Sequence, residues 1–111
     1  MSKQQEQSSQ SIQLWIGLAK VEQPRRNGVL GDADQAFTNV IAAAKNRTAF
    51  RALVKRALTE LGLRLIRLEN AETLDRRLSK YSINEELLSL VKQVQRQGNV
   101  GFSTFHAFDR E

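Results

Sequence analysis

The sequence contains no cysteine, a single histidine and a single proline, and the first two scarcities exclude several kinds of site. A chain without cysteine forms no disulfide, no thiolate zinc site and no cysteine nucleophile. One histidine, His106, excludes a metal site built from several histidines of one chain. We therefore expect no cofactor, and the lack of cysteine is compatible with a cytoplasmic location.

Long apolar stretches are also missing. No apolar run approaches the length that crosses a bilayer, and the N-terminal MSKQQEQSSQ lacks the apolar segment of a secretory signal. Residues 1–10 are polar and without aromatic side chains, which predicts a disordered tail. Residues 11–111 are expected to form one domain, because 111 residues can bury a core without metal or disulfides. These features predict a cytoplasmic protein without membrane contact.

The chain is basic, with a formal net charge of +5 and a pI of about 10.1. A basic balance is typical of proteins that bind nucleic acid or an acidic protein, and it also favours solubility. The 17 basic residues are mixed with 12 acidic ones and form no long block of one sign, which weakens the nucleic-acid interpretation.

The clearest structural signal is a unit of strand, helix and strand between Gln35 and Asn70. Asn46 is a favoured helix N-cap, and Gly62 stands where a left-handed residue often ends a helix. Between them, apolar residues recur at steps of three and four, as on the buried side of an amphipathic helix. This pattern predicts a helix over residues 47–61.

Four segments have the composition or the alternation of strands: 12–19, 36–44, 63–68 and 100–107. In the first, apolar residues alternate with a second set that includes Trp15. The second and fourth are rich in β-branched and aromatic residues. The third is a short apolar run without strict alternation, which is typical of a strand buried on both faces or interrupted by a bulge.

A second main helix is predicted over residues 83–97. Ser82 and Glu85 have the spacing of a reciprocal capping box, and Gly98 provides the end. Residues 71–80 are expected to contain a short helix, whose charged side chains would face water.

These elements predict an α+β fold in one domain, in the order strand, strand, helix, strand, short helix, helix, strand. We expect a two-layer sandwich, in which both main helices cover one face of a mixed or antiparallel sheet of about four strands.

Trp15 lies on the second face of the first strand, where it would pack under a helix, line a pocket or form a dimer interface, and the first option is favoured. Gly17 beside it would leave room for a neighbouring side chain. If helices leave that face uncovered, association of two copies would bury it, so a homodimer is predicted.

The densest chemical cluster lies near the C-terminus, where hydroxyls and the histidine are mixed with phenylalanines. A hydrolase needs a nucleophile in contact with a base. In a strand Ser103 and His106 point to opposite faces, and Thr104 is a poor nucleophile without a turn to expose it. No catalytic residue is therefore assigned, and the aromatic and histidine side chains are candidates for an interface or pocket. These candidates are Trp15, Phe102, Phe105 and His106.

Two groups of basic residues could contact an anion. Arg47, Arg51 and Lys55 are four residues apart and form one stripe of the first helix. Arg25 and Arg26 follow Pro24 in a long loop over residues 23–35. Both groups are more often simply solvated. The carboxylates Asp32 and Asp34 in the same loop fall far short of a calcium motif, so no metal site is assigned.

No motif resembles that of a known family, and no acid–base or nucleophile constellation is found. We expect a non-catalytic protein-interaction module, a homodimer that binds a further protein. Small bacterial immunity proteins and accessory proteins of mobile elements belong to this class, which is an analogy of size and style. The alternative is a nucleic-acid-binding protein that uses the basic helix stripe and the arginine loop. A pocket for a small molecule near Trp15 and His106 is a third, weaker option.

Overall fold

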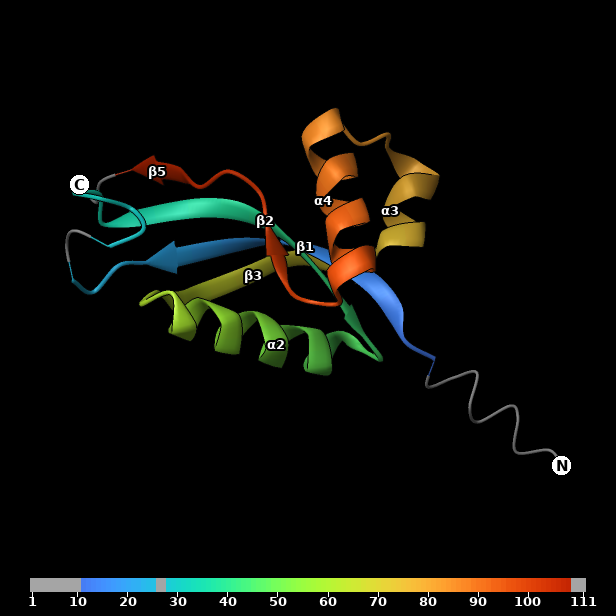
Figure 1. Cartoon of the computed structure of the whole chain (residues 1–111), viewed down its shortest axis with the longest axis horizontal. Coiled ribbons are helices and arrows are strands. Elements are labelled where there is room, and N and C mark those ends of the chain that lie inside the picture. Colours follow the sequence, from blue (N-terminus) through green and yellow to red (C-terminus); the bar gives the residue numbers. More distant parts are fainter. Residues whose placement is uncertain (1–10, 26–27, 109–111) are drawn as a thin grey trace, which may run out of the picture.

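The computed structural model describes residues 11–25 and 28–108, so the predicted tail and Arg26 lie outside the described part. The fold is α+β, as predicted, and its antiparallel sheet has the strand order β3-β1-β2-β4, with β5 also paired to β2 (Figure 1). The elements are β1 (Gln13–Glu22), β2 (Gln35–Ala44), α2 (Arg47–Glu60), β3 (Arg64–Thr73), α3 (Leu74–Lys80), α4 (Glu85–Gln97), β4 (Gly101–Phe102) and β5 (His106–Phe108).

β1 and β2 form the centre of the sheet. They pair without interruption over ten residues each, from Gln13 opposite Ala44 to Glu22 opposite Gln35. A Cβ atom at Gly17 would lie 3.0 Å from Leu68 Cδ1, so glycine leaves the room that the sequence predicted for a neighbouring side chain.

α2 begins and ends for local reasons, which confirms the predicted helix to within one residue. The Asn46 side chain accepts a hydrogen bond of 2.8 Å from the amide of Ala49, and Gly62 follows the helix with a φ of 78°. Phe50, Val54 and Leu58 form its buried side. Of the helices in the described ranges, none is long and apolar enough to cross a membrane.

The two main helices cover opposite faces of the sheet, and the prediction of one shared face is wrong (Figure 1). Adjacent residues of β2 show the division, because Val40 belongs to the core under α2 and Ile41 to the core under α3 and α4. Successive side chains of a strand point to opposite faces, and both of these are fully buried. The sheet therefore has helices on both sides.

The second core is smaller than the first. Among the strand residues it takes in only Leu14, Ile16 and Ile41, all near the end of the sheet that α3 and α4 cover (Figure 1). Leu74 contributes from α3, and α4 contributes Leu90, Val91 and Val94. Towards the other end of the sheet, none of the described helices covers this face.

β3 is longer than the predicted strand over residues 63–68. It continues to Thr73 because its pairing with β1 resumes after each of two register shifts, and Asn70 takes a positive φ of 55° in its second half. At its end the Thr73 hydroxyl accepts a hydrogen bond of 3.2 Å from the amide of Arg76. That cap starts α3, which confirms the predicted short helix.

α4 starts at Glu85, and the predicted capping box is wrong. Asn84 is the N-cap, since its side chain accepts a hydrogen bond of 2.9 Å from the amide of Leu87. Ser82 and Ile83 stay outside the helix. Asparagine and serine are about equally good N-cap residues, so Asn84, which lies nearer the apolar stripe of α4 than Ser82, becomes the N-cap. The predicted stop at Gly98 is confirmed by its left-handed conformation.

The predicted strand over residues 100–107 is split into β4 and β5. Ser103 causes the break, because its hydroxyl accepts a hydrogen bond of 3.0 Å from the amide of Asn39. The hydroxyl of Thr38 donates to the carbonyl of Ser103 at 3.0 Å. These side-chain bonds add to a backbone bond of 2.9 Å from the amide of Ser103 to the carbonyl of Asn39, and the regular ladder stops between the two short strands.

The loop between β1 and β2 is organised by a buried glutamine. The amide nitrogen of Gln23 donates to the carbonyls of Gly31 and Ala33 at 2.8 and 3.0 Å, and its oxygen accepts from the amide of Leu30 at 3.0 Å. Gln23 is 6% exposed. Its three bonds hold the described part of the loop against the end of the sheet.

Candidate functional site

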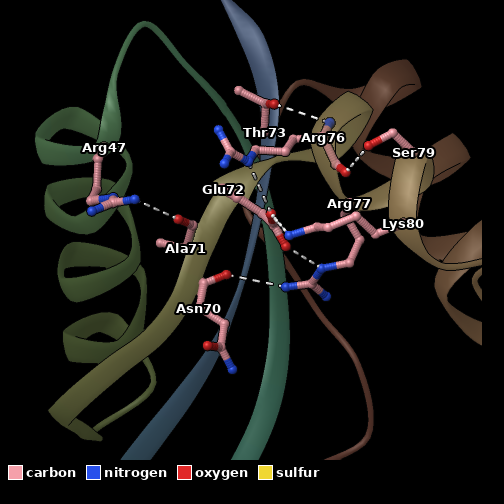
Figure 2. A network of polar contacts seen from close by, with 9 residues as sticks. All are labelled: Arg47, Asn70, Ala71, Glu72, Thr73, Arg76, Arg77, Ser79 and Lys80. Atoms are coloured by element: carbon pink, nitrogen blue, oxygen red, sulfur yellow. Dashed lines mark hydrogen bonds and ion pairs between the residues drawn. The ribbon is translucent and has the colours of Figure 1, made fainter.

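A pocket of about 890 Å³ lies beside the end of β3. α3 and the segment that leads into α4 form one wall, and the start of α2 contributes Arg47. Figure 2 shows how polar side chains from these elements converge there. Below, the term cationic pocket means this hollow and its charged lining, which consists of Arg47, Glu72, Arg76, Arg77 and Lys80.

Glu72 is the centre of the cationic pocket (Figure 2). One carboxylate oxygen accepts from Lys80 Nζ at 2.9 Å, and the other accepts from Arg77 Nε at 2.5 Å. Arg76 Nε lies farther away, at 3.9 Å. The hydrogen bond from Lys80, followed by that from Arg77, holds the pKa of Glu72 below its ordinary value of 4.5. The carboxylate therefore stays ionised at neutral pH.

Backbone carbonyls fix two of the guanidinium groups. Arg77 Nη2 donates to the carbonyl of Asn70 at 3.1 Å, and Arg47 Nη2 donates to the carbonyl of Ala71 at 3.0 Å (Figure 2). These bonds bring the start of α2 and the body of α3 to the same end of β3. Four cationic side chains thus line the pocket, whereas Glu72 is the single carboxylate among its lining residues.

Apolar and aromatic side chains complete the cationic pocket. Trp15, Ile83 and Leu87 line it, and the exposed ring of Tyr81 lies under Lys80, whose Nζ is 5.9 Å from the ring centroid. The Trp15 indole nitrogen is the one buried side-chain polar atom without a hydrogen-bond partner in the described ranges. The pocket therefore joins a charged half to an apolar half.

A second candidate surface is the part of the sheet that α3 and α4 leave uncovered. Strand alternation places Leu18, Lys20 and Phe37 on this face, and the ring of Phe108 stacks on Phe37 with centroids 5.4 Å apart. Lys20 Nζ lies 5.9 Å from both ring centroids. We call these four residues the open sheet face.

Two ion pairs flank the open sheet face. Arg64 pairs with Glu22, and Arg67 pairs with Glu69. In the pairing of β1 with β3, Arg67 lies opposite Lys20 and Glu69 lies opposite Leu18. Glu22 follows Lys20 by two residues on β1, and Arg64 lies opposite Glu22. The border of the face therefore carries both signs of charge.

The predicted interface residues do not form one surface. Trp15 stacks on Phe50 of α2, with ring centroids 6.0 Å apart, and it also lines the cationic pocket. The favoured prediction that Trp15 packs under a helix is confirmed, because α2 covers its face of the sheet, so this face is not left open for a second copy. Phe102 and Phe105 contact each other at 5.8 Å and pack against the same core. His106 is exposed in β5, opposite Phe37.

The hydroxyl of Thr104 bonds to a carboxylate and not to His106. Thr104 donates to Glu86 through its hydroxyl at 2.7 Å and through its amide at 2.8 Å. These bonds, the hydroxyl first, hold the pKa of Glu86 below its ordinary value. All three residues are exposed, and neither described pocket includes them. The arrangement ties the chain between β4 and β5 to the start of α4.

The predicted anion contacts lie at two ends of the molecule. Arg47, Arg51 and Lys55 are exposed along α2, and of these Arg47 reaches the cationic pocket. Arg25 is exposed beyond the opposite end of β1. The carboxylates Asp32 and Asp34 belong to no group that could hold a metal among the residues described.

Sequence reasoning missed the charged cluster around Glu72. Arg76 and Lys80 follow Glu72 at four and eight residues, so they line one side of a helix that starts near it. That spacing was the available signal, although the charges of this helix were expected to face water.

Comparison with family models, with curated proteins and with solved structures found no match to this chain.

Proposed function

We propose that the protein is a non-catalytic protein-interaction module that forms a homodimer through the open sheet face. The observation that carries this proposal is the stacked pair of Phe37 and Phe108, which lies with Leu18 on a sheet surface that no described helix covers. Aromatic residues are enriched at the centres of protein interfaces, where they bury a large area at a low cost in conformational entropy.

The border of the open sheet face favours a second copy of the chain as the occupant. A two-fold interface brings the same patch of both subunits together, so each charge needs an opposite charge on the same patch. The pairs Arg64–Glu22 and Arg67–Glu69 supply both signs. Such a border suits self-association, whereas a border of one sign would favour a partner of the opposite charge.

The dimer would leave the cationic pocket and the outer side of α2 accessible to the further protein that the sequence predicts. This further protein would be acidic, because Arg51 and Lys55 form an exposed row of cations on α2. The module would then act by holding two copies of such a partner.

The dimer is tested by sedimentation equilibrium at micromolar concentrations, with a variant of the open sheet face and a matched control. Phe108→Ser removes a ring from the proposed centre, and we expect the dimer dissociation constant to rise about 30-fold or more, as for a central interface residue. Leu88→Ser removes an apolar side chain that is 44% exposed on α4, and dimerisation should be unchanged. A wild-type chain that stays monomeric at about 100 µM, far above the dissociation constant of a specific dimer, would refute the proposal.

Nucleic-acid binding is the second candidate, because Arg47, Arg51 and Lys55 are all exposed on one side of α2. Such a stripe would bind phosphates without sequence preference, and binding would fall steeply with salt. Retention on immobilised single-stranded DNA at low salt that is lost at moderate salt, and lost in Arg51→Gln/Lys55→Gln, is the expected result. Indifference to DNA at low salt would remove this candidate.

A further inference from the structure

We infer that the cationic pocket is a binding site for the phosphoryl group of a small organic phosphate, whose apolar or aromatic part rests on the other half of the pocket. The site is separate from the open sheet face, so the inference does not depend on the dimer. It rests on the charges that line the pocket, on the donors that its side chains offer and on its size.

The lining holds more positive charge than its one carboxylate can balance. Glu72 already uses both oxygens, one for Lys80 and one for Arg77. Arg76, at 3.9 Å from the nearer oxygen, is beyond hydrogen-bond distance, and its side chain is 74% exposed. Like charges held close together repel, so an anion that enters the pocket gains their combined attraction.

The arginines offer the donor geometry that a phosphoryl group requires. A guanidinium carries five N–H donors in a planar fork that matches phosphate oxygens in pairs. Among the hydrogen bonds of the pocket, Arg47 uses Nη2 for the carbonyl of Ala71, and Arg77 uses Nε and Nη2. The bonds to backbone carbonyls hold both planes in place, so part of the ordering cost is met before a ligand arrives.

Glu72 acts as a spacer between the cations. Its bonds to Lys80 and Arg77 draw α3 onto the end of β3, which keeps the cationic groups of α3 beside the hollow (Figure 2). A pocket of cations without this carboxylate would spread apart by repulsion. Its side chain is 13% exposed, which leaves most of the accessible surface of the cluster to the cations.

The size and the apolar half of the pocket favour a small molecule with a ring. About 890 Å³ lies within the range of small-molecule sites, which is about 300–1,000 Å³. Tyr81 is 62% exposed, so its ring is available for stacking. The buried Trp15 indole N–H lacks an acceptor at the pocket wall, which a ligand oxygen could supply after a small movement of the lining.

The test uses AMP, which has a phosphoryl group and a planar ring, with inorganic phosphate and adenosine as partial probes. Trp15 is the only tryptophan, so its indole N–H gives one resonance in a ¹⁵N-labelled sample and reports on the pocket directly. We expect AMP to shift this resonance in a saturable way. Phosphate should compete with AMP at higher concentration, and adenosine alone should bind far more weakly than AMP.

Variants separate the pocket from general basicity. Arg76→Gln and Arg47→Gln should each weaken AMP binding about tenfold, because each removes a charged donor. Arg51→Gln, one turn along α2 and outside the pocket lining, should leave it unchanged. Among the described residues Arg76 makes one ion pair, at 3.9 Å, so its loss should leave thermal unfolding nearly unaffected and keep the test valid.

Three results would overturn the inference. The first is an absence of AMP binding by the folded wild-type chain at millimolar concentration. The second is equal loss of affinity in the Arg51 control and the pocket variants. The third is binding of a single-stranded oligonucleotide without any binding of AMP, which would assign the charge to a nucleic-acid surface. None of these results bears on dimerisation, so the two proposals fail independently.

Discussion

The most informative perturbation of the fold is truncation of Ile41, because this side chain decides which face of the sheet α4 covers. Ile41 is fully buried in the core under α3 and α4, whereas Ile66 of β3 is 38% exposed. Ile41→Ala should destabilise the chain by about 2–5 kcal/mol, the usual cost of a buried isoleucine. Ile66→Ala removes the same atoms from a partly solvated site and should cost about 1 kcal/mol or less.

A pair of double-mutant cycles then shows which helix Ile41 meets. Val94 of α4 and Val54 of α2 are 1% and 0% exposed, so Val→Ala at either removes a comparable buried side chain. Combined with Ile41→Val, the Val94 change should show a coupling of at least about 0.5 kcal/mol, because both residues belong to one core. The Val54 change should be additive within about 0.3–0.5 kcal/mol, because it lies across the sheet.

Urea unfolding, followed by far-ultraviolet circular dichroism, measures these differences. The m-values should stay equal among the variants, so that the midpoints report stability. A larger coupling of Ile41 with Val54 than with Val94 would refute the arrangement of helices on opposite faces. So would an Ile41→Ala variant that is no less stable than Ile66→Ala.

Three further predictions concern single polar residues. The folded-state pKa of Glu72 lies below 4.5, so its stabilising contribution is complete above pH 4.5 and is lost as the pH falls below 4.5 through the folded-state pKa. The urea midpoint of Glu72→Gln should therefore depend less on pH in this range than that of the wild-type chain. Parallel curves of midpoint against pH would contradict the assigned bonds. Gln23→Ala should destabilise the chain by about 1–3 kcal/mol, since it leaves buried loop groups unpaired, and faster amide exchange at Leu30 should accompany the loss. Asn84→Ala should cost about 0.5–2 kcal/mol in thermal unfolding while Ser82→Ala costs less than about 0.5 kcal/mol, and the reverse order would restore the capping box.

Local signals in the sequence predict the individual elements well. Asn46 and Gly62 bound α2 because a cap and a left-handed residue act on the nearest backbone groups, and no tertiary contact is needed to recognise them. The same reasoning failed by two residues at α4, where Ser82 and Asn84 compete for one role. Only the position of the first buried turn decides between them.

The distribution of helices over the two faces required information from outside each element. Both faces of β1 and β2 carry apolar residues, and this pattern alone predicts one face covered by helices and one face available for a partner. The adjacent buried residues Val40 and Ile41 were the signal for two covered faces. They do not show which helix reaches which face, since that depends on the path of the chain through β3 and α3.

The cationic pocket shows a similar limit. The part contributed by α3 follows from the spacing of Arg76 and Lys80 along one side of that helix, four and eight residues after Glu72 at the end of β3. Arg47 precedes its carbonyl partner, Ala71, by 24 positions in the sequence. Their contact depends on the packing of α2 against β3, which the sequence does not show. Likewise, nothing in the sequence separates Phe37 and Phe108 from the phenylalanines that became core.

The measurement that tests the proposed function most directly is a search for intermolecular nuclear Overhauser effects in a sample that mixes isotope-labelled and unlabelled chains. A homodimer through the open sheet face predicts intermolecular contacts from the rings of Phe37 and Phe108, and none from the indole of Trp15, which lies under α2. Absence of any intermolecular effect, or effects confined to Phe102 and Phe105, would contradict the proposal.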